Sequence, residues 1–159
     1  MNLPPIPFSI EEATLKDLFA IRLIEKECFG EDAWSLLELA GVLTISGSTR
    51  LKAVVNKKVV GFIAGNREFN NKIGWITTLA VLIKYQRRGL AAALLAACEK
   101  ILAAPTMRLC VRISNEPAIQ LYQHKGYKQI DVRHRYYAGD EDAFVLEKKV
   151  DSANSSEEF

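Results

Sequence analysis

The sequence contains few cysteines, and their spacing fits neither a disulfide framework nor a zinc site. Its 159 residues include three cysteines, Cys28, Cys98 and Cys110, and no two of them form a C-x-x-C pair. An odd number of widely spaced cysteines argues against a disulfide-stapled secreted fold and against a cysteine-ligated zinc centre. We therefore expect a protein of the reducing cytoplasm, and no metal is implied.

The sequence also lacks a strong excess of charge and long apolar runs. The formal net charge is +2, which is too small to predict nucleic acid as the main partner. The longest apolar run, L-A-A-A-L-L-A-A-C, is far too short to span a bilayer. The opening M-N-L-P-P-I-P-F-S-I has neither the basic nor the apolar region of a signal peptide. We expect no nucleic-acid or membrane partner, and we expect a monomer.

The composition is that of a globular protein. Hydrophobic residues make up 49% of the chain and charged residues 25%, and this length suffices for one hydrophobic core. We predict one domain over residues 1–150. The polar ending D-S-A-N-S-S-E-E-F, residues 151–159, is predicted to be a disordered tail.

Hydrophobic periodicity predicts an α/β fold. Alternating segments predict strands over residues 8–13, 50–55, 58–65, 72–81, 107–113, 127–137 and 143–150. Helical spacing predicts helices from Leu15, from Ser35, from Arg88 and from Asn115. The order β-α-α-β-β-β-α-β-α-β-β predicts a mixed, mostly antiparallel sheet of about seven strands with helices on both faces.

One motif indicates an anion site. The hexapeptide Q-R-R-G-L-A, Gln86 to Ala91, stands between a predicted strand and a predicted helix. Cations at the start of a helix are unfavourable unless an anion is bound there. Gly89 would let a ligand approach the backbone, and the first N–H groups of the helix point outward, as in a pyrophosphate cradle. The alternative is a surface loop with solvated arginines.

Three segments in order resemble one enzyme family. Q-x-x-G-x-A after a strand ending in L-A-V is similar to the acetyl-coenzyme A motif of the GNAT N-acetyltransferases. V-R-I-S-N-E-P-A-I-Q-L-Y-Q-H-K-G-Y resembles the second half of that family. R-H-R-Y-Y-A-G-D-E-D-A-F-V-L resembles the RimI-type branch, which acetylates protein N-termini, ribosomal protein S18 being its best known substrate. The resemblance covers roughly residues 74–148, with a weaker C-F…W-S match at residues 28–35.

The resemblance implies a site for acetyl-coenzyme A. In this family the strand before the loop separates from the next parallel strand, and the pantetheine arm lies in the gap. The implied contacts are the backbone of Leu79, Ala80 and Val81 for that arm, and the N–H groups of Arg87, Arg88, Gly89, Leu90, Ala91 and Ala92 for the phosphates. Asn115 would reach the coenzyme arm, or serve as a plain helix cap, or both. Tyr122 matches the family's general acid for the departing thiolate. The alternative for Tyr122 is a surface residue of an amphipathic helix.

The sequence departs from the family at one catalytic position. RimI-type enzymes carry L-E-V-R where this chain has L-C-V-R, so Cys110 replaces the proposed general base. This departure has three interpretations. In the first, no base is required because the acceptor is an α-amine, with a pKa of about 7.7–8.0, of which about a quarter is neutral near pH 7.4. A lysine amine, with a pKa of about 10.4, is neutral in only about one molecule in a thousand.

Two other interpretations of this departure are open. Glu31 is the second candidate for the base, acting directly or through water, with Asp32 and Glu27 as weaker candidates. The alternative for all three is solvated surface charge, which is favoured for Glu27. In the third interpretation, Cys110 itself reacts, because Arg108 and Arg112 share its strand face and would favour the thiolate. A lone strand cysteine is more often an inert apolar residue.

Aromatic residues are candidates for the walls of a peptide groove. Phe29 and Trp34 lie in the first interhelical connection, and Tyr136 and Tyr137 lie in the last hairpin, although all four also suit core or hairpin packing. The acidic turn A-G-D-E-D would attract a basic peptide or is an ordinary turn. We expect an acetyl-coenzyme A-dependent enzyme that acetylates a protein N-terminus, possible substrates including ribosomal protein S18. The alternatives are a small-molecule amine acceptor and a non-catalytic coenzyme A-binding module.

Overall fold

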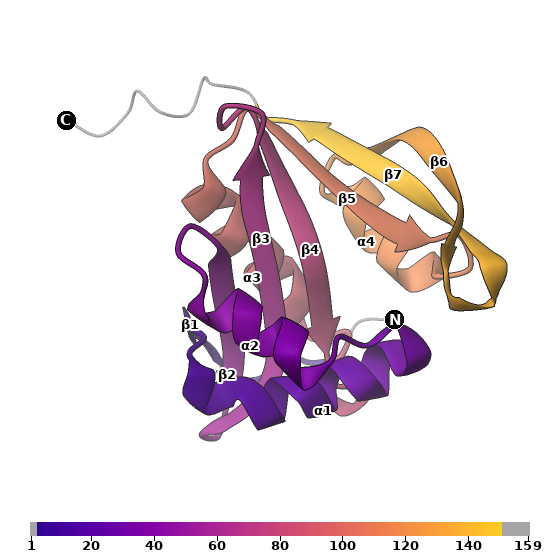
Figure 1. Cartoon of the computed structure of the whole chain (residues 1–159). Coiled ribbons are helices and arrows are strands. Elements are labelled where there is room, and N and C mark those ends of the chain that lie inside the picture. Colours follow the sequence, from indigo (N-terminus) through magenta and orange to yellow (C-terminus); the bar gives the residue numbers. More distant parts are fainter. Residues whose placement is uncertain (1–2, 151–159) are drawn as a thin grey trace. The chain divides into compact units, whose positions relative to one another are not determined.

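A computed structural model describes residues 3–150 and shows the predicted α/β architecture (Figure 1). The strands are β1 (Ser9–Glu12), β2 (Thr49–Val55), β3 (Lys58–Glu68), β4 (Ile73–Val81), β5 (Thr106–Arg112), β6 (Lys128–Tyr137) and β7 (Glu141–Lys149). The helices are α1 (Leu18–Phe29), α2 (Leu36–Thr44), α3 (Leu90–Leu102) and α4 (Glu116–His124), with short 3-10 turns at Leu15–Asp17, Gly30–Asp32, Ile83–Tyr85 and Ala138–Asp140. The order of strands and α-helices is the one that the periodicity predicts.

The strands form one seven-stranded sheet in the order β1-β2-β3-β4-β5-β7-β6. The β4–β5 pair is parallel, whereas the β1–β2, β2–β3, β5–β7 and β6–β7 pairs are antiparallel. The mixed, mostly antiparallel sheet is therefore confirmed. The β4–β5 ladder joins residues 73–76 to residues 106–109.

The described residues divide into two compact units. The first unit comprises residues 3–66 and 77–102, and the second unit comprises residues 67–76 and 103–150. β4 begins in the second unit and ends in the first. The predicted single domain over residues 1–150 remains a prediction, and the predicted disordered tail lies outside the described residues.

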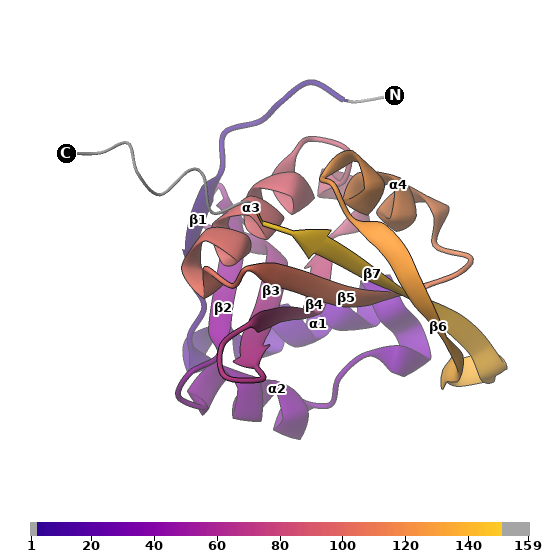
Figure 2. The same cartoon turned by 90° about the horizontal axis from the view of Figure 1, so that it is seen from above.

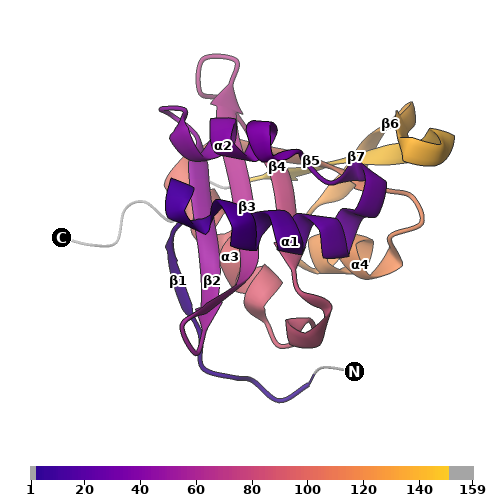
Figure 3. The same cartoon turned by 60° about the horizontal axis from the view of Figure 1, so that its bottom comes forward.

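In the first unit, helices cover both faces of β2 and β3. Figure 3 shows α1 and α2 in front of these strands and α3 behind them. On the α1–α2 face, Phe62 and Ala64 pack with Ile21, Leu39 and Leu43. This core forms because apolar residues recur at helical spacing on α1 and α2 and alternate along the facing strand.

Helix starts in the first unit follow local capping chemistry. Thr14 and Asp17 form a capping box that opens the turn before α1. Ser35 caps α2 by accepting a hydrogen bond from the Glu38 N–H, and the Glu38 carboxylate accepts one from the Ser35 N–H at 2.8 Å. The polar side chains thus satisfy N–H groups that a helix start leaves unpaired. The predicted helix from Arg88 begins two residues later, at Leu90, because Arg87 and Gly89 adopt left-handed backbone angles.

In the second unit, α4 lies on one side of β5 and β7 (Figures 1 and 2). Its buried core includes Met107, Leu109 and Val111 of β5 and Val145 and Leu146 of β7. Asn115 caps α4 by accepting a hydrogen bond from the Ala118 N–H at 3.3 Å, so its predicted role as a helix cap is confirmed. None of the helices within residues 3–150 combines the length and apolarity that crossing a membrane requires.

Candidate active site

The end of β4 in the first unit is joined to the Q-R-R-G loop by the short turn Ile83–Tyr85. Ala80 and Val81 are buried at this end, and Leu79 is half-buried. The Gln86 side-chain amide donates to the Val81 carbonyl at 2.8 Å, and the Cys28 thiol donates to the same oxygen at 3.2 Å. Gln86 therefore closes the loop back onto the strand, and the Val81 carbonyl is fixed by two donors.

The loop presents backbone N–H groups at the start of α3. Arg87 has φ 62° and Gly89 has φ 87°, so the chain turns sharply twice before Leu90. The Ala93 N–H makes a bond to the Gly89 carbonyl, as a first helical turn requires. The N–H groups of Leu90, Ala91 and Ala92 belong to the part of the helix that has no intrahelical acceptor.

The space at Gly89 is open. A Cβ built on Gly89 would meet nothing within 4 Å, so packing does not explain the glycine, and its positive φ does. Open space beside outward N–H groups and two arginines suits a phosphate-bearing ligand. The residues present in this loop therefore fit the phosphates of coenzyme A.

Sequence reasoning missed a buried acid next to this strand. Glu25 of α1 is only 1% exposed, and its Oε1 accepts a 2.6 Å hydrogen bond from the Thr78 hydroxyl of β4. Its Oε2 accepts a hydrogen bond from the Trp34 N–H. Burial raises the pKa of the Glu25 carboxyl, although the Thr78 and Trp34 donors oppose the shift. The sequence does contain a signal for this burial, because Glu25 follows Ile21 and Ile24 on the core-facing stripe of α1.

Three predicted residues lie at the end of α1 and in the connection to α2. Glu31 is exposed in the Gly30–Asp32 turn, and Phe29 is half-buried. Trp34 packs against the apolar core of the first unit, which supports the packing interpretation of this residue. Of the weaker acidic candidates, Glu27 accepts a hydrogen bond from the Ile83 N–H at 3.2 Å.

The second unit brings four of the predicted residues together. Tyr136 and Tyr137 contact each other edge to face, with ring centroids 4.9 Å apart. The pKa of Tyr137 is raised by burial first, and then by repulsion from the ionised forms of Cys110, Tyr136 and Tyr122, whereas Arg112 opposes the shift. We call these four residues the thiol–phenol cluster.

Tyr122 is the most buried member of the thiol–phenol cluster. It is 7% exposed, and its ring packs edge to face on Tyr127 with centroids 5.7 Å apart. The alternative of a surface tyrosine is therefore wrong: the α4 stripe turns this residue inward. Burial raises the pKa of the Tyr122 phenol, so the hydroxyl stays protonated at neutral pH and can donate a proton.

The arginines of β5 on either side of Cys110 are paired with glutamates of β7. Arg108 pairs with Glu147 at 2.6 Å, and Arg112 pairs with Glu141 and lies over the Tyr137 ring. Burial raises the pKa of the Cys110 thiol, although the charge of Arg133 and a hydrogen bond from Tyr136 oppose the shift. The cation that favours the Cys110 thiolate is therefore Arg133, whereas Arg108 and Arg112, which we expected in that role, each pair with a glutamate.

The acidic turn is largely engaged by neighbouring residues of the second unit. Glu141 accepts hydrogen bonds from the backbone and the hydroxyl of Ser114 as well as from Arg112. Asp142 pairs with His134 at 3.0 Å and accepts from the Arg135 N–H at 2.9 Å. These pairs favour the ordinary-turn interpretation of A-G-D-E-D for Glu141 and Asp142.

Comparison with known proteins identifies the family. The pattern of the "Acetyltransferase (GNAT) family" matches residues 15–127. The chain is 34% identical over 148 residues to the N-terminal acetyltransferase A complex catalytic subunit NAA10 of Arabidopsis thaliana, covering 89% of this chain and 77% of that protein. It is 39% identical over 108 residues to an N-alpha-acetyltransferase of Sulfurisphaera tokodaii, covering 59% of this chain and 65% of that one.

A solved structure agrees with this assignment. The crystal structure of the ribosomal-protein-S18-alanine N-acetyltransferase from Escherichia coli has a TM-score of 0.82 and 27% identity, and the match covers 96% of this chain and all of that one (100%). The chain belongs to the GNAT family and is an acetyltransferase that uses acetyl-coenzyme A.

Proposed function

We propose that this protein transfers the acetyl group of acetyl-coenzyme A to the α-amino group of protein N-termini. The observation that carries the proposal is the chemistry at Cys110. The glutamate proposed as the general base of RimI-type enzymes is replaced there by a thiol, and burial raises the pKa of that thiol, so it stays protonated near neutral pH and does not accept the amine proton. An α-amine tolerates that loss, since about a quarter of it is neutral near pH 7.4. The names of the relatives from Arabidopsis thaliana and Sulfurisphaera tokodaii support the same acceptor class.

In the proposed reaction, the neutral amine attacks the thioester carbonyl carbon, and the carbon–sulfur bond breaks. The Val81 N–H polarises the carbonyl oxygen. Tyr122 donates its proton to the departing sulfur. The amine proton goes to solvent, with Glu31 acting through water as the alternative acceptor.

The remaining predicted residues have binding roles in this proposal. The backbone of Leu79–Val81 and the side chain of Asn115 hold the pantetheine arm, and Arg87–Ala92 hold the phosphates. Phe29, Trp34, Tyr136 and Tyr137 contact the peptide. Ribosomal protein S18 is one candidate acceptor, which we base on the RimI-type resemblance of residues 133–146. We propose that the enzyme acts as a cytoplasmic monomer.

A thiol-release assay with two peptides tests the proposal. One peptide begins Ala-Arg-Tyr with a free α-amine, and the other has a blocked α-amine and one internal lysine. We expect turnover of the first peptide alone. Turnover of the second, or of neither while coenzyme A still binds, would instead support a lysine or small-molecule acceptor, or a non-catalytic module.

Two variants locate the proton acceptor. Glu31→Gln should leave turnover of the first peptide nearly unchanged if solvent takes the amine proton, and should lower it if Glu31 does. Cys110→Ser should retain activity, because the proposal gives the thiol no covalent role. Loss of turnover in Cys110→Ser with folding intact would indicate an acetyl-cysteine intermediate.

A further inference from the structure

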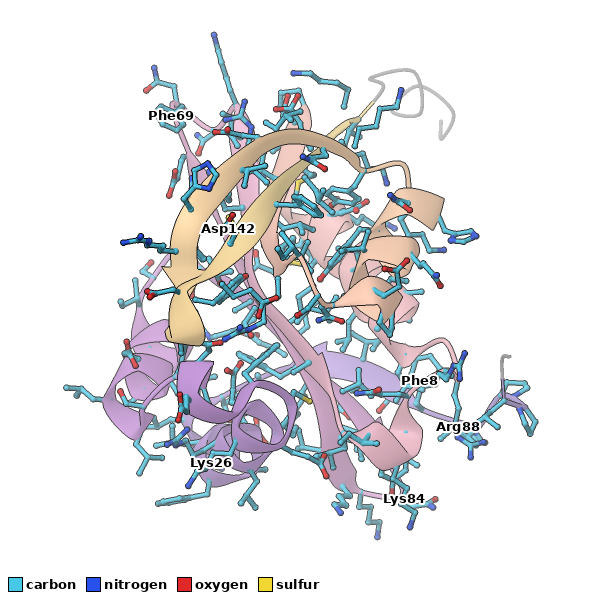
Figure 4. The ribbon with its side chains drawn as sticks, turned by 90° about the vertical axis from the view of Figure 1, so that its right-hand side faces the viewer. Phe8, Lys26, Phe69, Lys84, Arg88 and Asp142 are labelled. Carbon is cyan, nitrogen blue, oxygen red and sulfur yellow. The ribbon has the colours of Figure 1, made fainter. Side chains whose placement is uncertain are left out.

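The segment Leu3–Phe8 lies against the Q-R-R-G loop. The Leu3 N–H donates to the Arg87 carbonyl at 2.9 Å, and the Arg88 guanidinium donates to the Pro4 carbonyl at 3.0 Å. Figure 3 shows this indigo segment leaving β1 and passing beside the loop that precedes α3, and Figure 4 shows Phe8 and Arg88 on the same side of the molecule. Both arginines of the motif are thus held by residues more than eighty positions earlier.

The segment is stiff and is anchored at both ends. Prolines at positions 4, 5 and 7 restrict its backbone before folding. At one end Leu3 and Pro4 bind the loop, and at the other Ser9 pairs with Val54 in the β1–β2 ladder. A restricted segment loses little conformational entropy when it is held in place. The entropy loss therefore offsets little of the free energy that its two contacts with the loop contribute.

The Leu3 hydrogen bond is made to a loop residue with an unfavourable backbone conformation. Arg87 has φ 62°, a left-handed angle that residues with side chains adopt unfavourably. Neighbouring Gly89 reaches φ 87° without that penalty. The Leu3 hydrogen bond fixes the Arg87 carbonyl, and with it the peptide plane that carries the Arg88 N–H.

We propose that Leu3 and Pro4 are positioning residues for coenzyme A binding. The Leu3 N–H holds Arg87 in its left-handed conformation, and the Pro4 carbonyl orients the Arg88 guanidinium, so that the loop is preorganised for the pyrophosphate. This inference rests on the proposed role of the loop in binding the phosphates. Preorganisation strengthens binding because the ligand does not have to order the loop itself.

The substitution Leu3→Pro tests the inference, because it deletes the N–H in a segment that already contains prolines at positions 4, 5 and 7. Leu3→Ala is the matched control, since it removes the side chain and keeps the N–H. We expect the Kd of coenzyme A, measured by titration calorimetry, to rise about three- to tenfold in Leu3→Pro, as for loss of one hydrogen bond. The KM for acetyl-coenzyme A should rise in parallel, with kcat and the peptide KM unchanged. Leu3→Ala should behave as the wild type.

The outcomes separate this inference from the proposed function. Equal coenzyme A binding by Leu3→Pro and the wild type would overturn the positioning role. Tighter binding by Leu3→Pro would also overturn it, because the segment would then hold the loop in a conformation that disfavours binding. Failure of the wild type itself to bind coenzyme A would overturn the phosphate role of the loop as well.

A second measurement needs no variant. Thermodynamic coupling is reciprocal, so saturating coenzyme A should slow hydrogen exchange at the Leu3 amide of the wild-type protein. Exchange that is unchanged by coenzyme A would contradict the inference even if Leu3→Pro folded poorly.

Discussion

At the scale of single residues, the two buried acids Tyr122 and Glu25 have different roles. Tyr122 is a phenol whose proton burial retains. Glu25 is a carboxyl buried between α1, β4 and the Trp34 backbone. The first is a candidate proton donor and the second a structural link, and substitutions distinguish them.

Tyr122→Phe should lower kcat and leave folding intact. The ring still packs on Tyr127, but the proton donor for the leaving sulfur is gone, and general acid catalysis is worth about 10²- to 10⁴-fold. We expect kcat in the thiol-release assay to fall about a hundredfold or more, with the Kd of coenzyme A nearly unchanged. Tyr127→Phe, which changes the neighbouring ring, should retain most of kcat. Full activity in Tyr122→Phe would assign the proton to another donor.

Glu25→Gln should alter how stability depends on pH. The folded-state pKa of Glu25 is raised above 4.5, so the folded protein binds this proton more tightly than the unfolded chain does. Wild-type stability contributed by this proton is therefore lost as pH rises above that value. Because glutamine does not titrate, the stability of Glu25→Gln relative to wild type should increase from acid to neutral pH. Urea unfolding at several pH values measures the difference, and a difference independent of pH would contradict the buried-carboxyl assignment.

At the scale of elements, the turn before α3 has a conformational requirement at Gly89, and we propose that it also binds phosphate. Gly47, in the turn between α2 and β2, provides a natural comparison. It has φ 90°, and a Cβ at this position, as at Gly89, would meet no atom within 4 Å. The two positions share the same backbone constraint, but only Gly89 lies in the proposed phosphate loop.

Gly89→Ala and Gly47→Ala should therefore differ in one measurement only. Each should lose about 1 kcal/mol of unfolding free energy, since a left-handed angle disfavours a Cβ. Gly89→Ala should also raise the KM for acetyl-coenzyme A, because its methyl group enters the open space beside the helix N-terminus. Unfolding and steady-state kinetics measured on both variants give the comparison. An equal KM in the two variants would argue against phosphate binding at Gly89.

At the scale of the whole molecule, the pH dependence of the reaction reports on the acceptor. If the amine supplies its own neutral form, kcat/KM should rise about tenfold per pH unit below the α-amine pKa of about 7.7–8.0 and level off above it. No fall is expected up to about pH 9, because burial raises the pKa of the Tyr122 phenol. Rates measured from about pH 6 to 9 test this. A profile that is already level near pH 6 would indicate a protein base.

The sequence by itself determined the order of elements and the place of the proposed phosphate loop. Helix caps at Thr14, Ser35 and Asn115 and the two periodicities are local signals, so they survive without tertiary information. The spacing of Gln86, Gly89 and Ala91 marked the acetyl-coenzyme A motif for the same reason.

Only the tertiary structure decided which charged groups are engaged. The pairing of Arg108 with Glu147 and of Arg112 with Glu141 depends on strand register. The burial of Glu25 against Thr78, and the contact of Leu3 with Arg87, join segments distant in the chain. Electrostatic effects depend on distance and burial, and neither quantity is encoded in the spacing of residues along the chain.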